Sequence, residues 1–146
     1  MDQPSGAPRE SRRDDGVVLR VLIYSDDHRT RAQVRGALGT RLHPDLPELE
    51  FLDVATAPIV LTELDTGTVD LVILDGETAP YGGLGLAKQL RDEYDPCPPL
   101  LVLIARAADR WLADWSRADA SATLPVDPIA LSHEVTALLR RGPARA

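Results

Sequence analysis

Two carboxylates stand where apolar runs of the sequence end. Asp75 closes the run "DLVILD" (70–75) and precedes a glycine, and Asp26 directly follows the run "RVLIYS" (20–25). A carboxylate at the end of a buried strand costs free energy unless it pairs with, binds or reacts with another group. In an open α/β sheet the carboxyl ends of neighbouring strands meet at one edge, where ligands bind. We therefore predict that Asp26 and Asp75 lie together and form the chemical site of the protein.

The elements that would carry these residues follow from hydrophobic periodicity. Apolar runs rich in Val, Ile and Leu predict strands near 19–25, 49–56, 70–75, 99–105 and 121–125. Segments of helical period between and after these runs predict helices at 29–39, 58–66, 82–94, 108–118 and 128–141. Near-continuous apolar strands, each followed by a helix, are typical of a parallel sheet that is buried on both faces. The predicted fold class is α/β, a five-stranded parallel sheet with helices on both faces.

Length, composition and charge limit the classes of function. The 146 residues are 44% hydrophobic and 27% charged, which suits one globular domain at 17–141 between tails at 1–16 and 142–146 that we predict to be disordered. The net charge of -7 argues against binding to nucleic acid, and no apolar run approaches the ~20 residues of a membrane span. The single cysteine, Cys97, cannot form an internal disulfide, and no signal-type segment opens the chain, so we expect a cytoplasmic protein.

The order of these segments over 20–139 resembles the receiver domain of two-component response regulators. The matching motifs are "RVLIYSDD", "DLVILDGETAPYGGLGLAKQLR" with its glycine at Gly83, "PLLVLIA" and "RADASATLPVDPIAL". The resemblance implies a doubly wound, CheY-like (flavodoxin-like) fold and a protein of two-component phosphorelay signalling that is not an enzyme. Position by position, it implies that Asp75 is the phosphoacceptor, that Asp26 is a metal-binding acid, and that Pro125 follows a cis peptide bond.

Four positions depart from the pattern of that family. Ser25 stands in place of one member of the acidic pair, Ile104 in place of the hydroxyl residue that closes the fourth strand, Ser121 in place of the switch aromatic, and Leu124 in place of the lysine before the proline. Phosphoryl transfer to a carboxylate requires Mg²⁺ held by carboxylates and an ammonium group on the phosphoryl oxygens. Because serine and leucine supply neither, we predict a degenerate site with weak or absent phosphorylation.

The predicted metal site leaves two alternatives open. A register shifted by one residue would make Asp26 and Asp27 the acidic pair, and either register keeps Asp26. Glu77, two residues after Asp75, either swings into the site to replace the carboxylate lost at Ser25 or stays a solvated loop residue. We predict at most a weak Mg²⁺ site, formed by Asp26, Asp75 and Glu77, and no other cofactor.

Three functions are compatible with these residues. The favoured one is an atypical, stand-alone receiver, with no DNA-binding output domain after 128–141, that acts mainly as a protein-binding module. The second is a functional phosphorelay receiver that a sensor histidine kinase phosphorylates on Asp75. The third is a small-molecule-binding α/β domain in which Ile104 and Leu124 line a non-polar pocket.

Both tryptophans of the chain, Trp111 and Trp115, lie one turn apart on the predicted helix 108–118 and therefore share a face. Either they cover the sheet, or they face outward while the smaller residues of the helix cover it. In receivers, the surface of the fourth helix, fifth strand and fifth helix is the usual place for dimers and partners, and exposed tryptophan is typical of interface hot spots. We expect this surface to bind another protein: a sensor kinase, a regulated target or a second copy of the chain.

Overall fold

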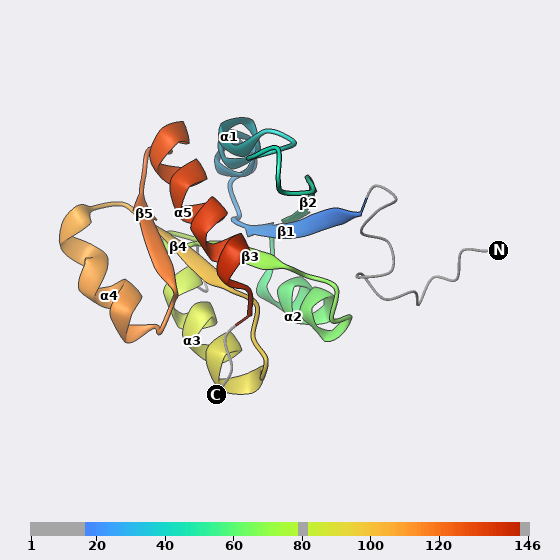
Figure 1. Ribbon diagram of the computed structural model, residues 1–146. Helices are drawn as coiled ribbons and strands as arrows, with labels where there is room; N and C mark the ends of the chain where they lie inside the picture. The colour runs from blue at the N-terminus through green and yellow to red at the C-terminus, as the bar shows by residue number, and fades with distance from the viewer. Residues whose placement is uncertain (1–16, 79–81, 144–146) are drawn as a thin grey trace.

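A five-stranded, fully parallel sheet forms the centre of the computed structural model, which describes residues 17–78 and 82–143 (Figure 1). The strand order is β2-β1-β3-β4-β5. The strands are β1 (Val18–Tyr24), β2 (Glu48–Val54), β3 (Leu71–Asp75), β4 (Leu100–Ile104) and β5 (Ala120–Thr123). The chain reverses its direction of winding after β2, so the sheet is doubly wound and the predicted fold class is confirmed.

Helices cover both faces of this sheet. They are α1 (His28–Leu38), α2 (Ala57–Asp65), α3 (Gly83–Glu93), α4 (Arg110–Trp115), which a short 3₁₀ turn at Ala107–Asp109 precedes, and α5 (Pro128–Arg141). Buried residues of α1 and α5 pack together against one face of the sheet. Buried residues of α2, α3 and α4 pack against the other face.

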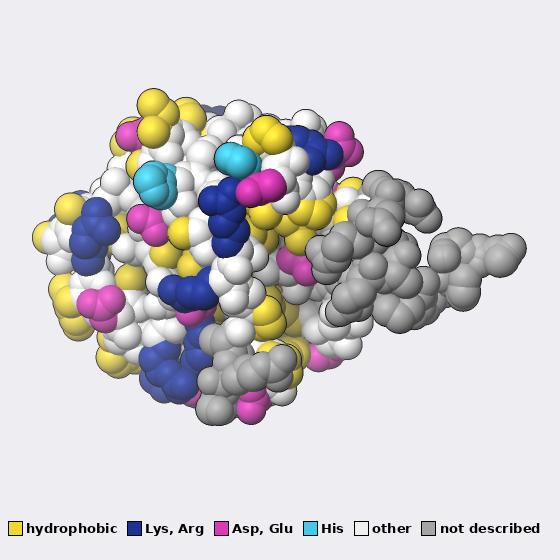
Figure 2. All heavy atoms as spheres, viewed as in Figure 1, with side chains coloured by type: hydrophobic (Ala, Val, Ile, Leu, Met, Phe, Trp, Pro, Cys, Tyr) yellow, Lys and Arg dark blue, Asp and Glu magenta, His cyan; other side chains and the backbone are white. Residues whose placement is uncertain are grey.

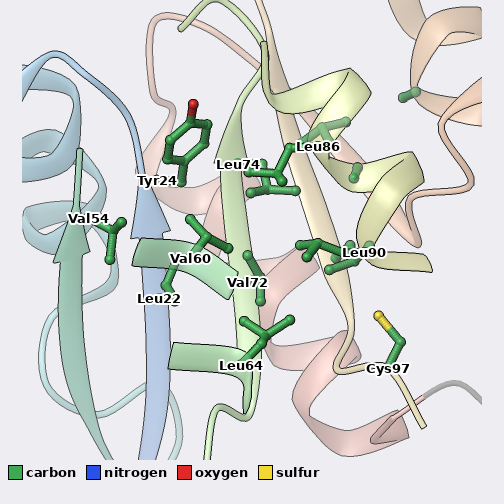
Figure 3. Packing of buried hydrophobic residues seen from close by; sticks show 14 of the residues in the cluster. Leu22, Tyr24, Val54, Val60, Leu64, Val72, Leu74, Leu86, Leu90 and Cys97 are labelled. Carbon is green, nitrogen blue, oxygen red and sulfur yellow. The ribbon is translucent and has the colours of Figure 1, made fainter. Parts of the chain in front are cut away.

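Alternation of side chains along β1, β3 and β4 divides the core into these two layers. All five residues of β3 and all five of β4 are buried. Figure 3 shows Val60 and Leu64 of α2 and Leu86 and Leu90 of α3 packed on the layer that contains Val72 of β3. Since each fully buried leucine or valine stabilises the fold by roughly 1.5–3 kcal/mol, the two layers hold β3 firmly in place. The end of β3 is therefore a rigid position for a functional residue.

Side chains that precede α1 and α5 explain where these two helices begin. Asp127 accepts hydrogen bonds from the backbone N–H groups of Ile129 and Ala130, at 3.0 and 3.4 Å, and Pro128 is the first residue of α5. Asp27 caps α1 by accepting from the N–H of Arg29 at 2.9 Å, and this bond lowers the pKa of the Asp27 carboxyl group.

Most predicted elements begin and end within about two residues of the observed ones, and the largest difference is in one helix. The prediction of a helix at 108–118 is too long, because a 3₁₀ turn occupies Ala107–Asp109 and Arg117 adopts a positive φ of 63°, which ends α4. The predicted tails at 1–16 and 142–146 lie outside the described residues, except for Gly142 and Pro143. None of the described helices has the length and apolar content needed to cross a membrane.

Candidate functional site

Asp75 is the last residue of β3, and its carboxylate lies beside the end of β1. The two strands are neighbours in register, with Tyr24 opposite Leu74, so the next residue of each chain segment comes to the same edge of the sheet. Ser25 is completely buried there, and its Oγ donates a hydrogen bond to Oδ2 of Asp75 at 2.7 Å. The N–H of Glu77 donates to Oδ1 of Asp75 at 2.9 Å. Both carboxylate oxygens of this nearly buried aspartate therefore accept a hydrogen bond.

Two glycines allow the loop after β3 to pass close to the sheet. A Cβ at Gly76 would lie 2.7 Å from the carbonyl oxygen of Leu103, and a Cβ at Gly83 would lie 2.6 Å from the carbonyl oxygen of Asp75. Real Cβ atoms do not approach backbone oxygens so closely, so glycine is required at both positions. The sequence motif that contains Gly83 thus has a steric reason: α3 begins directly against the backbone of Asp75.

Thr78 connects the loop after β3 to the loop after β1. Its side chain is buried, and its Oγ1 accepts a hydrogen bond from the N–H of Asp26 at 3.3 Å. Its own N–H donates to the carbonyl oxygen of Asp75 at 3.2 Å. The sequence analysis missed this residue, because a threonine in a loop carries no periodic signal and its partner is far away in the chain.

The acidic residues of the predicted metal site differ in their exposure to solvent. Asp75 is nearly buried, whereas Asp26 and Glu77 are exposed at the same edge of the sheet. Within 17–78 and 82–143, no three His, Cys, Asp or Glu side chains gather as they would around a metal ion. Asp27, the other acid of the shifted register, caps α1 with its carboxylate. Metal binding by Asp26, Asp75 and Glu77 stays a prediction.

Curated relatives of the chain are response regulatory proteins. In two strains of Mycobacterium tuberculosis, an uncharacterized response regulatory protein is 56% identical over 127 residues, which cover 87% of this chain and 96% of the relative. The chain belongs to the response regulator receiver family. No family model matches the sequence.

Solved receiver domains share the fold of this chain. The receiver domain of a Francisella response regulator has a TM-score of 0.70 at 19% identity, and the match covers 84% of this chain and 98% of that one. A Thermotoga maritima response regulator, solved in complex with Mg²⁺ and BeF, has a TM-score of 0.67 at 24% identity and covers 82% and 98% of the two chains. At these identities the similarity concerns the fold, in which Asp75 occupies the carboxyl end of the central strand.

Three further positions that depart from the receiver pattern lie on β4 and β5 or directly after them. Ile104 is completely buried in the layer under α2, α3 and α4. Leu124 is half-buried against the layer under α1 and α5, and the peptide bond between it and Pro125 is cis, as the resemblance implied. Ser121 Oγ accepts a hydrogen bond from Nη1 of Arg110 at 3.3 Å.

The two tryptophans face outward. Trp111 is 64% exposed and Trp115 is 53% exposed, whereas Ala113 between them is buried against the core. Lys88 of α3 places its Nζ 6.0 Å from the centroid of the Trp115 ring. Of the two alternatives for this helix, the small residue covers the sheet and the aromatic residues face solvent.

Proposed function

We propose that this receiver acts mainly as a protein-binding module and that Asp75 is phosphorylated weakly or not at all. The observation that carries the proposal is the environment of the Asp75 carboxylate. A buried serine hydroxyl occupies the position of the second acid, and Leu124, packed on apolar side chains, occupies the position of the ammonium group. The charges that would neutralise a phosphoryl group are replaced by a neutral donor and a hydrocarbon.

The loss of the ammonium group has a large electrostatic effect. At a separation of ~4 Å and an effective dielectric constant of ~20, one ion pair contributes up to ~4 kcal/mol before desolvation is counted. Phosphorylated Asp75 would lack that stabilisation at Leu124. A cation at Oδ2 would share that oxygen with the hydroxyl of Ser25, which donates to it at 2.7 Å.

Mg²⁺, the cation that receiver chemistry uses, fits the residues of this edge poorly. Both oxygens of Asp75 already accept hydrogen bonds, from Ser25 and from the backbone of Glu77. The remaining acids, Asp26 and Glu77, are exposed. We infer weak binding at most, with Glu77 as the candidate replacement for the carboxylate that Ser25 lacks.

The usual transmission of a phosphorylation signal would also fail in this chain. Ile104 has no hydroxyl to follow a phosphoryl group, and Ser121 has no ring to change its position. The outward-facing Trp111 and Trp115 are therefore available whatever the state of Asp75. Large exposed aromatic side chains are concentrated in protein interfaces, so we propose that α4, β5 and α5 present the binding surface for a kinase, a regulated target or a second copy.

Intact-mass measurement after incubation with acetyl phosphate and Mg²⁺ tests this proposal. We expect most of the wild-type chain to keep its mass, and Asp75→Asn gives the background for modification elsewhere. The double variant Ser25→Asp with Leu124→Lys is the matched control, because it restores both missing charges and should gain a phosphoryl group. Near-complete addition of one phosphoryl group to the wild type would favour the competing function, a phosphorelay receiver that uses Asp75.

A further inference from the structure

A cavity of about 520 Å³ opens at the edge of the sheet opposite Asp75. It lies where α2 and α3 end and where the chain enters β3 and β4, so residues of 64–70 and 93–98 form most of its lining. The length of β3 separates this cavity from Asp75 by roughly 16 Å, at about 3.3 Å per residue. Its volume falls within the range of roughly 300–1,000 Å³ that small-molecule sites occupy. We call it the acidic cavity, for the charges described below.

Hydrocarbon forms much of the wall of the acidic cavity. The apolar and aromatic residues of the lining are Leu64, Val69, Tyr94, Pro96, Pro98 and Pro143. Leu64 is buried and belongs to the core layer under α2 and α3, so this part of the wall is held by the packing of the fold. Figure 2 shows hydrophobic and acidic side chains together in the lower part of the surface, where Figure 1 places α2 and the end of α3. Such a wall suits the hydrocarbon part of a ligand.

The charges of the acidic cavity have one sign. Among the described residues that line it, the charged side chains are Asp65, Asp70, Glu93 and Asp95. Asp65 accepts a hydrogen bond from the hydroxyl of Tyr94 at 2.6 Å, and Glu93 accepts one from the side-chain amide of Gln89 at 3.1 Å, so both donors are neutral. Burial, together with the hydrogen bond to Asp65 and the charges of Asp65 and Glu93, raises the pKa of Tyr94 to about 12. The tyrosine thus reports a negative potential at the wall.

The backbone of the lining offers few hydrogen-bond donors to a ligand. The N–H groups of Gly67, Asp70 and Tyr94 donate to carbonyl oxygens of the protein, at 3.0, 2.8 and 3.0 Å. The prolines of the lining have no N–H group at all. An anion would therefore meet like charges and occupied donors, whereas an ammonium group, which has donors only, would meet carboxylate oxygens.

The spacing of the carboxylates separates a metal ion from an organic cation. Within 17–78 and 82–143, no three His, Cys, Asp or Glu side chains gather as they would around a metal ion, so the four carboxylates are spread along the cavity. Spread carboxylates match positive charges that are several atoms apart. We propose that the acidic cavity binds a linear organic polyamine, with its ammonium groups on the carboxylates and its methylene groups on the apolar wall. The proposal is independent of the chemistry of Asp75, which lies at the other edge of the sheet.

Calorimetric titration of the full chain with spermidine, at constant ionic strength, tests the proposal. We expect the wild type to bind spermidine at least tenfold more tightly than butylamine, which has a single ammonium group. Asp65→Asn with Glu93→Gln should weaken spermidine binding by about tenfold, because two partly exposed ion pairs contribute about threefold each. Asp114→Asn with Glu134→Gln is the matched control, since it removes the same two charges from exposed positions outside the cavity and should change the affinity less than twofold.

Two filling variants separate the cavity from the general negative charge of the chain. Val69→Phe and Pro143→Trp keep every carboxylate but occupy the volume, so each should weaken spermidine binding by about tenfold. Pro143 is exposed after the end of α5, so its variant stays informative if Val69→Phe fails to fold, and urea midpoints identify the folded chains. The proposal is overturned if spermidine binds no more tightly than butylamine, if the control loses as much affinity as the variant of Asp65 and Glu93, or if the folded filling variants bind like the wild type.

Discussion

Ser25→Ala removes the hydroxyl that donates to Asp75, and we expect it to lower the free energy of unfolding by about 1.5–3 kcal/mol. That range applies to hydrogen bonds that involve a charged group. The bond is short, at 2.7 Å, and both partners are shielded from water: Ser25 is 0% exposed and Asp75 is 4% exposed. The same Oγ also accepts from the N–H of Asp27 at 3.1 Å, so alanine deprives two polar groups of a partner.

Urea denaturation measures this effect directly. With a slope of roughly 1–3 kcal/mol per molar urea, a loss of about 2 kcal/mol moves the midpoint down by about 1 M. Ser116→Ala is the matched control, because Ser116 is equally buried but donates to the neutral carbonyl of Ala113 at 2.7 Å and should cost only about 0.5–1.5 kcal/mol. In an Asp75→Ala background the cost of Ser25→Ala should shrink, because the charged partner is gone. Equal costs in both backgrounds, or a cost no greater than that of Ser116→Ala, would refute the assignment of Ser25 as the structural partner of Asp75.

Four other measurements address the remaining features of the site and the surface. Leu124→Lys should lower the free energy of unfolding in urea by about 1 kcal/mol, because the leucine is partly buried. A larger loss in an Asp75→Asn background would show that the new lysine pairs with Asp75. Titration of Mn²⁺ should give weak binding that weakens further in Glu77→Ala, whereas equal affinities would remove Glu77 from the metal site. Trp115→Ala should weaken self-association or partner binding by about 2 kcal/mol with an unchanged circular dichroism spectrum, and an unchanged affinity would exclude this ring from the interface. Burial, together with a hydrogen bond to a carboxylate, raises the pKa of Tyr94 from 10.0 to about 12. The stability that this shift contributes is therefore complete below pH 10 and is lost as the pH rises toward 12. Tyr94→Phe should flatten the dependence of the free energy of unfolding on pH between 10 and 12, and an unchanged dependence would contradict this assignment.

The parts of the fold that depend on local chemistry were predictable from the sequence. The apolar runs that became β3 and β4 are buried at every position, and the pair Asp127-Pro128 starts α5 where a cap and a first-turn proline are expected. The end of α4 was not predictable, because Arg117 adopts a left-handed conformation that its residue type disfavours.

Part of the candidate site was likewise predictable from the sequence, and part of it was not. The position of Asp75 at the edge of the sheet followed from the strand pattern alone. The bond from Ser25 and the link through Thr78 join segments that are about fifty residues apart, and only the packing of the sheet brings them together. The outward direction of Trp111 was also not predictable, since the helical spacing allowed either face of the helix to cover the sheet.

The arrangement of Asp75 and the cavity between β5 and α5 bears on whether the proposed binding surface responds to Asp75. Leu103 of β4 is the register partner of Asp75 and also lines the cavity, so a single strand separates the carboxylate from the surface. That strand offers only buried hydrocarbon, in Leu103 and Ile104, and neither side chain has a polar group that could follow a charge on Asp75. Within β4, a change at Asp75 thus meets no polar side chain through which to open or close the cavity. We therefore expect Asp75→Asn to leave self-association unchanged within twofold by sedimentation equilibrium, and a larger shift would mean that the backbone of β4 couples the two sites.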